Sequence, residues 1–329
     1  MQDQDLTLLA GLGKRTLKKL HAAGIGTIQN LASTSVEQLQ KYKIGKETAR
    51  KTWMAALAWC RVQYPWEAGE ELLEEYQHRQ YLTSGTKALD RIFRGRGFEA
   101  GKVYEVYGPP GAGKTNLLFQ LICTAFVPPA QGGLGAGTVF IDTEDTFSLP
   151  RVLEIARRFG IDPQELRQRI RRTVPPTSDF LIYVCETQVE QMMAEVKARF
   201  LCLDSLASLL RAEYGTAKDR LPERQVKIDL VLSALRRLAQ VAKAVVLLTN
   251  QTTVRPNVIS SQDATTHALG HVAGHGVPVR LKMRMLKSIT GMCEIKVEKS
   301  FDLPPGTCKL YLGAEGFTDH PSKKLTQEY

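Results

Sequence analysis

The chain has 329 residues, of which 43% are hydrophobic, and carries a net charge of +10. That length suits one large domain plus a smaller one, and the apolar content can fill a core. The absence of an apolar run of about 18 residues and of a signal-like N-terminus excludes membrane-spanning and secreted proteins, and we expect no membrane partner. The positive charge favours a polyanionic partner, although it also fits a protein that is merely well solvated.

Residues 1–65 form a basic segment with helical apolar spacing, which we interpret as a small all-α DNA-binding domain. A Gly11-Leu12-Gly13 turn leads into a lysine-rich run that contains Lys14, Arg15 and Lys18. Backbone N–H groups at the start of such a helix, beside these cations, suit a DNA phosphate and read no bases. In the alternative interpretation, the glycines only cap the helices of a small bundle.

Residues 66–80 form an acidic stretch that begins with Trp66 and has five glutamates among its first ten residues. This composition predicts a linker rather than a core element. Trp66 is our candidate for a subunit anchor, because large aromatic side chains are frequent interface hot spots. Alternatively, Trp66 packs back onto its own N-terminal domain.

Residues 81–329 alternate apolar runs with amphipathic stretches, the pattern of an α/β domain. The predicted strands are 102–107, 138–142, 180–185, 199–204, 244–249, 279–285, 292–298 and 307–312. The predicted helices are 114–126, 149–159, 187–198 and 222–242. The alternation predicts a mostly parallel sheet flanked by helices, and the last three strands, which lack long helices between them, predict an antiparallel edge.

Residues 108–115 match the phosphate-binding loop pattern GxxxxGK[ST], between a predicted strand and a predicted helix. The residues expected to bind a nucleoside triphosphate are Gly108, Pro109, Pro110, Gly111, Ala112, Gly113, Lys114, Thr115 and Asn116. Lys114 would reach the outer phosphates and the Thr115 hydroxyl would ligate Mg²⁺. The alternative is an ordinary glycine-rich turn between a strand and a helix.

Three further strands end in polar side chains that complete such a site. Asp204 follows an apolar strand and would hold Mg²⁺ together with Thr115. Glu144 follows the predicted strand at 138–142 and would activate a water molecule against the γ-phosphate. Gln251 would sense the γ-phosphate by hydrogen bonding. Glu144 could otherwise be a helix cap.

Two further features bear on location and partners. The six cysteines include no CxxC pair, which indicates reduced core thiols in a cytosol-like compartment. A run of arginines between residues 157 and 172 either touches DNA or forms a solvated helical face.

The motifs GPPGAGKT, FIDTEDTF, CLDSLASLLRAEY, LPERQ and TNQ, in this order and spacing, resemble the archaeal RadA and eukaryotic recombinase branch of the RecA superfamily. The resemblance covers nearly the whole chain, including a helix-hairpin-helix N-terminal domain. It implies an ATP- and Mg²⁺-dependent protein that forms filaments on single-stranded DNA, also binds double-stranded DNA, and promotes homologous pairing and strand exchange.

The resemblance also implies roles for individual residues. Glu144 and Gln251 match a catalytic glutamate and a γ-phosphate sensor, and Arg151 matches an arginine that stacks on adenine. A first DNA-binding loop would use Lys218, Arg220 and Arg224, and a second would use Arg255 and His275. Lys299 and Pro304 would lie in a segment that covers the ATP of a neighbouring subunit.

The chain departs from the family pattern in several places. The first loop lacks Gly-Arg-Gly, the second ends in Leu269-Gly270-His271, and Lys299 replaces an acidic residue. These departures are similar to those of paralogues that load or stabilise a main recombinase, which is the alternative function. A homo-oligomer, as filament or ring, or a hetero-assembly with a main recombinase is therefore expected, in the cytoplasm with the nucleoid or in a nucleus.

Overall fold

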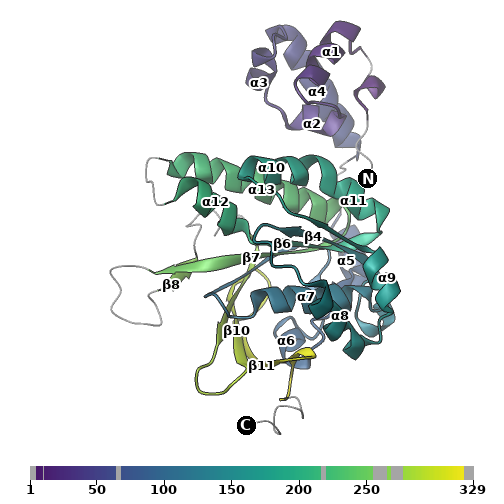
Figure 1. Cartoon of the computed structure of the whole chain (residues 1–329). Helices are drawn as coiled ribbons and strands as arrows, with labels where there is room; N and C mark the ends of the chain where they lie inside the picture. The colour runs from purple at the N-terminus through teal and green to yellow at the C-terminus, as the bar shows by residue number, and fades with distance from the viewer. Residues whose placement is uncertain are drawn as a thin grey trace. The chain divides into compact units, whose positions relative to one another are not determined.

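The computed structural model describes residues 5–9, 11–63, 68–215, 220–254, 265–267 and 277–321. It divides the chain into two compact units, Met1–His78 and Arg79–Tyr329 (Figure 1). Across the described residues, no helix combines the length and the apolarity needed to cross a membrane.

The N-terminal unit is helical and has its own core. Its elements are the 3₁₀ turn η1 (Leu6–Leu8) and the helices α1 (Lys14–Ala22), α2 (Ile28–Ser33), α3 (Val36–Lys41), α4 (Lys46–Gln63) and α5 (Gly69–His78). Leu20, Ile28 and Leu39 are fully buried in that core. The acidic stretch that we interpret as a linker is helical in α5, which buries none of its side chains.

The second unit is an α/β domain. Its strands are β1 (Tyr81–Leu82), β2 (Phe98–Glu99), β3 (Val103–Gly108), β4 (Gly137–Asp142), β5 (Ile170–Thr173), β6 (Ala198–Asp204), β7 (Val245–Val254), β8 (Thr265–His267), β9 (Val279–Met285), β10 (Met292–Lys299), β11 (Thr307–Gly313) and β12 (Gly316–Thr318). Its α-helices are α6 (Lys87–Ile92), α7 (Lys114–Phe126), α8 (Leu149–Ala156), α9 (Pro163–Gln168), α10 (Ser178–Tyr183), α11 (Val189–Glu195), α12 (Leu206–Tyr214) and α13 (Leu221–Val241). Short 3₁₀ segments lie at Pro129–Gln131 and Arg157–Phe159, and a π-helical segment at Val184–Gln188 joins α10 to α11.

Within the described part of the chain, ten strands form the main sheet in the order β12-β11-β10-β9-β3-β7-β6-β4-β5, with β8 paired to β7. The strands from β9 to β5 in this order run parallel, whereas β9 to β12 pair antiparallel with one another. The predicted α/β class, the mostly parallel sheet and the antiparallel edge are therefore confirmed.

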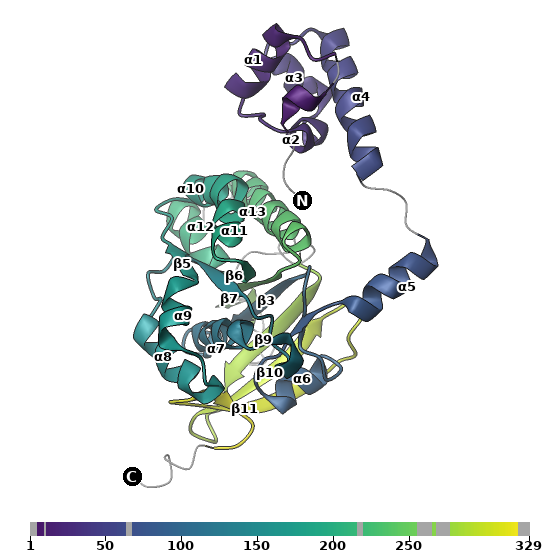
Figure 2. The ribbon, with the colours of Figure 1, turned by 90° about the vertical axis from the view of Figure 1, so that its right-hand side faces the viewer.

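Helices cover both faces of the parallel part of the sheet, as Figure 2 shows. On one face, Val106, Phe140 and Leu247 pack against α7 and α8. On the other face, Ile141 and Leu248 pack against α10 to α13. Alternate residues of each strand thus enter two separate cores, which explains why the buried strands read as continuous apolar runs. The carboxyl ends of β3, β4, β6 and β7 meet at one edge of the sheet.

The prediction of a strand at 180–185 was wrong. Those residues lie in α10 and the π-helical segment that follows it, and Thr177 caps α10 by accepting a hydrogen bond from the Phe180 N–H. The strand that pairs with β4 at the end of the sheet is instead β5, which lies within the arginine run. An apolar run of six residues fits a buried helix as well as a strand, and periodicity alone does not separate them.

Arginines occur in β5 because each finds a carboxylate from another element. Arg172 donates a 2.7 Å hydrogen bond to the buried carboxylate of Asp142, and Arg171 lies 2.6 Å from Glu195. The arginine run is therefore neither a helical face nor an unpaired basic surface at these two positions.

Candidate nucleotide-binding and catalytic site

The glycine-rich loop joins the end of β3 to the start of α7, as the sequence predicts. Gly111 and Gly113 have φ angles of +75° and +92°, in the left-handed region that favours glycine. A Cβ atom at Gly113 would lie 2.8 Å from the Phe317 ring, so a larger residue would also collide with β12. The Lys114 ammonium donates to the carbonyl oxygens of Gly108 and Pro109, at 3.0 and 2.9 Å.

Thr115 and Asp204 are brought together directly. The Thr115 hydroxyl donates a 2.6 Å hydrogen bond to Asp204, and the Thr249 hydroxyl donates to the other carboxylate oxygen. Burial raises the pKa of Asp204, although the hydrogen bonds from Thr115 and Thr249 act in the opposite direction. Burial lowers the pKa of Lys114, whereas the negative charges of Asp204 and Glu144 act to raise it.

Glu144 lies on a turn that Asp142 organises. The fully buried Asp142 carboxylate accepts hydrogen bonds from the backbone N–H groups of Thr146 and Phe147, and it pairs with Arg172. These contacts fold the chain after β4 into a tight turn and leave the Glu144 side chain exposed at the sheet edge. Glu144 is therefore not a helix cap, since Ser148 caps α8.

Two donors hold one oxygen of the Glu144 carboxylate. The Ser205 hydroxyl donates to Oε1 at 2.7 Å, and the Gln251 side-chain amide donates to the same oxygen at 3.0 Å. The carbonyl end of the Gln251 amide accepts a hydrogen bond from Arg211 in α12. The predicted catalytic pair Glu144 and Gln251 is thus in direct contact.

These groups line a cleft of about 270 Å³ at the carboxyl edge of the sheet. Its lining residues are Pro110, Gly111, Gly113, Lys114, Thr115, Asn116, Glu144, Asp204, Ser205, Gln251 and Leu312. Among the predicted nucleotide-binding residues, Gly108 and Pro109 contribute carbonyl groups to Lys114, whereas the Ala112 side chain is buried in the core below the loop.

Arg151 lies beside this cleft. Its guanidinium donates a 3.1 Å hydrogen bond to Asn116 and hydrogen bonds of 2.6 Å to the carbonyl oxygens of Gly313 and Ala314. These contacts place Arg151 between the first turn of α7 and the β11–β12 hairpin. The role of Arg151 in stacking on a base remains a prediction.

The oxygen groups of the cleft fit a bound magnesium nucleotide. Mg²⁺ is commonly held by one or two protein oxygens together with substrate phosphates, and Thr115 and Asp204 supply such oxygens beside Lys114. Nowhere in the described ranges do three or more His, Cys, Asp or Glu residues cluster as an all-protein metal site.

The predicted DNA-binding residues fall into three groups. Lys14, Arg15 and Lys18 are exposed at the start of α1, beside Gly11, which has a φ angle of +83°. Arg220 donates a 3.2 Å hydrogen bond to the carbonyl oxygen of Glu213, and Arg224 lies in the first turn of α13. Lys218, Arg255 and His275 lie outside the described residues, as does the predicted subunit anchor Trp66.

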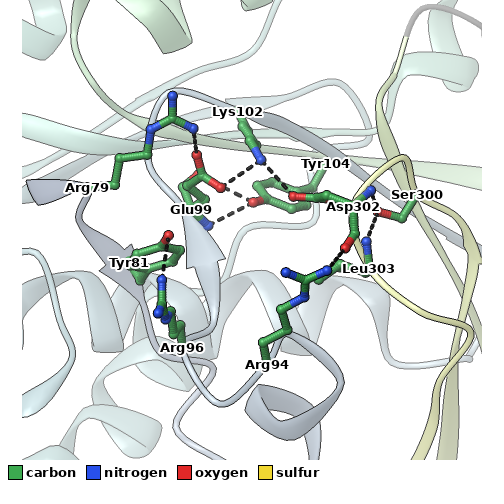
Figure 3. Close-up of polar contacts among 10 residues, drawn as sticks. All are labelled: Arg79, Tyr81, Arg94, Arg96, Glu99, Lys102, Tyr104, Ser300, Asp302 and Leu303. Atoms are coloured by element: carbon green, nitrogen blue, oxygen red, sulfur yellow. Dashed lines mark hydrogen bonds and ion pairs between the residues drawn. The ribbon is translucent and has the colours of Figure 1, made fainter. Parts of the chain in front are cut away.

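The predicted ATP-covering segment begins at the end of β10. The Lys299 ammonium donates a 3.1 Å hydrogen bond to the carbonyl oxygen of Val277, and Pro304 is exposed. Figure 3 shows that Asp302 anchors this segment, with its carboxylate 3.0 Å from Lys102 and its carbonyl oxygen accepting from Arg94. Lys102 also lies 2.6 Å from Glu99, which pairs with Arg79.

Sequence reasoning missed Ser205 and Leu312, which line the cleft, and Arg211, which donates a hydrogen bond to the lining residue Gln251. Ser205 directly follows the predicted Asp204, so its position next to the site was readable from the strand end. Arg211 was detectable only as the single cation of helix α12. Leu312 belongs to a hairpin whose place beside the cleft depends on the antiparallel edge of the sheet.

The loop, the Thr115–Asp204 contact and the carboxylate at the next strand end define a RecA-like P-loop ATPase core. Comparison with known families agrees: residues 77–320 match the Rad51 family model, and residues 3–56 match the SAM-like helix-hairpin-helix tandem model. The chain belongs to the Rad51 family. Membership supports a recombinase-type role, since this family consists of RecA-like recombinases that use ATP and Mg²⁺ and bind DNA.

Proposed function

We propose that this chain is an ATP-hydrolysing recombinase that binds single-stranded DNA, forms filaments, and promotes homologous pairing and strand exchange in DNA repair. The observation that carries the proposal is the contact between Glu144 and Gln251 in the cleft that also contains Lys114, Thr115 and Asp204. Such a protein would work beside DNA, in the cytoplasm with the nucleoid or in a nucleus.

Each side chain has a distinct part in the proposed hydrolysis. Lys114 would bind the outer phosphates as a point charge, and Thr115 and Asp204 would hold Mg²⁺, which would supply positive charge against the phosphates. Glu144 accepts a proton from the attacking water at its carboxylate. Gln251 and Ser205 orient that carboxylate by donating to one of its oxygens.

DNA binding in this proposal depends on cations rather than on base-reading side chains. The exposed Lys14, Arg15 and Lys18 lie at the start of α1, where backbone N–H groups also face outward. Arg220 and Arg224 lie at the start of α13, the helix that follows α12 in the sequence. Both sets suit phosphate contacts.

A second candidate function is a mediator that uses ATP as a switch while it loads or stabilises a main recombinase. The sequence departures at Leu269-Gly270-His271 and at Lys299 favour it. Electron microscopy with ATP and single-stranded DNA, followed by a strand-exchange assay with the chain alone, separates the two. Filaments and exchanged product support the recombinase, whereas DNA-stimulated turnover without exchange, and stimulation of a separate recombinase, support the mediator.

A further inference from the structure

Arg211 donates a hydrogen bond to the cleft residue Gln251 from helix α12, none of whose residues lines the cleft itself. It lies in the second half of α12, whose residues Leu206, Ala207, Leu210 and Tyr214 are buried against the sheet. Its guanidinium donates to Gln251, and its charge is close enough to Lys114 to act toward a lower pKa of that ammonium. Arg211 is therefore held in place next to the site by the packing of its own helix.

The amide of Gln251 is bound at both ends, which fixes its orientation. Its carbonyl oxygen accepts from Arg211, and its NH₂ group donates to Glu144. A primary amide has one accepting and one donating end, so a cation at the carbonyl end forces the NH₂ end toward the carboxylate. Without that cation, rotation of the amide would place its oxygen against the negatively charged Glu144.

The same arrangement orients Glu144. Ser205 and Gln251 both donate to Oε1, so the rotation of the carboxylate is set by two fixed donors. A general base must be held within hydrogen-bonding distance of the proton it removes, and small misplacements are costly. The orientation of Gln251 thus bears directly on the geometry of hydrolysis.

Helix α12 also connects Arg211 to the predicted first DNA-binding loop. The Gly215 N–H donates a 2.9 Å hydrogen bond to the Arg211 carbonyl oxygen, in the last turn of the helix. Arg220 donates to the carbonyl oxygen of Glu213, and its guanidinium lies 4.4 Å from the centre of the Tyr214 ring. A phosphate that binds the Arg220 guanidinium would compete with its contacts to Glu213 and Tyr214, which lie in the same last turn of α12 as Arg211.

We propose that Arg211 is a positioning residue for ATP hydrolysis, which acts through Gln251 on Glu144 and makes that geometry responsive to phosphate binding at Arg220. This inference rests on the proposed function, because it takes ATP as the substrate and DNA as the source of the phosphate. It requires no contact between Arg211 and the nucleotide.

A double-mutant cycle on the full chain tests the path through Gln251. We expect Arg211→Gln and Gln251→Ala each to lower kcat about tenfold and to change the KM for ATP less than about twofold. Because both changes break the same path, the double variant should be no slower than Gln251→Ala. Arg211→Lys should restore part of kcat, and Arg237→Gln, which breaks an ion pair with Glu190 on the outer helices, should match the parent. The inference would be overturned if the decreases in kcat of the two single variants multiplied in the double variant, or if Arg211→Gln raised the KM and left kcat unchanged.

Stimulation by single-stranded DNA tests the link through α12. Arg220→Gln, introduced into the parent, should reduce the factor by which single-stranded DNA raises the ATPase rate. Introduced into Arg211→Gln, it should leave that factor unchanged. An Arg211→Gln variant that DNA stimulates by the same factor as the parent would show that α12 does not carry the signal.

A measurement without turnover separates failure of this inference from failure of the proposed function. The Gln251 side-chain amide signals in a ¹H–¹⁵N spectrum can be assigned from their absence in Gln251→Ala. They should move in Arg211→Gln and stay in place in Arg237→Gln. If the parent proves to have no ATPase activity, the proposed function fails, while unmoved amide signals in Arg211→Gln would refute the positioning role itself.

Discussion

The Thr115 hydroxyl donates a 2.6 Å hydrogen bond to Asp204, and this contact joins the first turn of α7 to the carboxyl end of β6. Thr249 donates to the second carboxylate oxygen, so Asp204, which is only 2% exposed, has a donor on each oxygen. A buried carboxylate with these neighbours is a favourable place for a cation that also contacts phosphate.

Asp204→Asn should therefore weaken nucleotide binding only when Mg²⁺ is present. Asparagine keeps the shape of the side chain but removes the negative charge that attracts the cation, and we expect an affinity loss of about tenfold or more with Mg²⁺. Titration of a fluorescent ATP analogue with Mg²⁺ and with EDTA measures both cases. Asp229→Asn, on the exposed face of α13, is the control. Equal weakening with and without Mg²⁺ would contradict a metal-binding role.

Lys114→Ala should abolish nucleotide binding and, with it, nucleotide-dependent DNA binding. The lysine ammonium is held by two loop carbonyl groups at the place where the outer phosphates would lie, and alanine leaves those phosphates without a point charge. Fluorescence titration with ATP and ADP analogues is the direct measurement. Lys309→Ala, at an exposed position of β11, should bind like the parent. Undiminished ATP binding by Lys114→Ala would place the nucleotide elsewhere.

Glu144→Gln should retain ATP binding while turnover falls by roughly 10² or more, because the change removes a base and preserves its shape. The glutamine carbonyl oxygen can still accept the hydrogen bond from Ser205, so the turn after β4 should remain intact. Steady-state ATPase kinetics, together with binding of a non-hydrolysable analogue, separate the two effects. Normal turnover in this variant would assign the base to another residue.

The predicted site residues that the structure brings together are those whose roles depend on local patterns. Lys114 and Thr115 follow from glycine spacing, and Asp204 and Glu144 follow from the rule that parallel strands end at one edge of a sheet. Arg211 and Leu312 were missed because their positions depend on how α12 and the β11–β12 hairpin pack beside the cleft. No local pattern encodes that packing.

The errors in the predicted fold have the same origin. Residues 180–185 read as a strand because they are apolar, but a threonine cap and packing against α13 make them helical. The strand β5 was missed because Arg171 and Arg172 suggest a solvated surface. Their partners Glu195 and Asp142 lie more than 20 residues away in the sequence, and only the folded sheet brings them together.

DNA binding should weaken steeply with salt and depend on the cations of α1. Each phosphate contact to a single strand contributes about 0.7 to the slope of log K against log salt, so replacing Lys14, Arg15 and Lys18 by glutamine should lower the slope by up to about 2. Fluorescence anisotropy at several salt concentrations measures this for two oligonucleotides of different sequence. Lys51→Gln, which breaks an exposed pair with Glu47, is the control. If the triple variant kept the slope of the parent, Lys14, Arg15 and Lys18 would not contact DNA phosphates.

The contacts that anchor residues 300–303 should make unequal contributions to stability. Lys102, 16% exposed, binds both Glu99 and Asp302, whereas Asp302, 35% exposed, binds one lysine and Ser300 (Figure 3). We expect Lys102→Gln to lower the free energy of unfolding by about 1–3 kcal/mol, since it leaves the nearly buried Glu99 with fewer partners. Asp302→Asn should cost less than about 1 kcal/mol, because its pair is partly solvated.

The pH dependence of this difference follows from the two pKa shifts. Burial opposes charge on Lys102, but its hydrogen bonds to Glu99 and Asp302 outweigh burial and raise the pKa above the usual 10.5. Burial also opposes charge on Asp302, and hydrogen bonds from Lys102 and Ser300 outweigh it and lower the pKa below 3.8. The lysine contribution is therefore lost only as pH rises through its raised pKa, and the aspartate contribution only as pH falls through its lowered pKa. Between about pH 5 and 9 the cost of each substitution should be constant.

Urea unfolding with two probes measures these costs with a built-in control. The chain has three tryptophans, Trp53, Trp59 and Trp66, all before the second unit. Trp53 and Trp59 lie in α4, so their fluorescence reports on the N-terminal unit. Circular dichroism reports on the helices and strands of both units, so its transition includes the larger unit, where the anchoring contacts lie. Lys102→Gln should shift the circular dichroism transition to lower urea and leave the fluorescence transition unchanged. A shift in both transitions, or a larger shift for Asp302→Asn than for Lys102→Gln, would contradict the central place of Lys102 in this network.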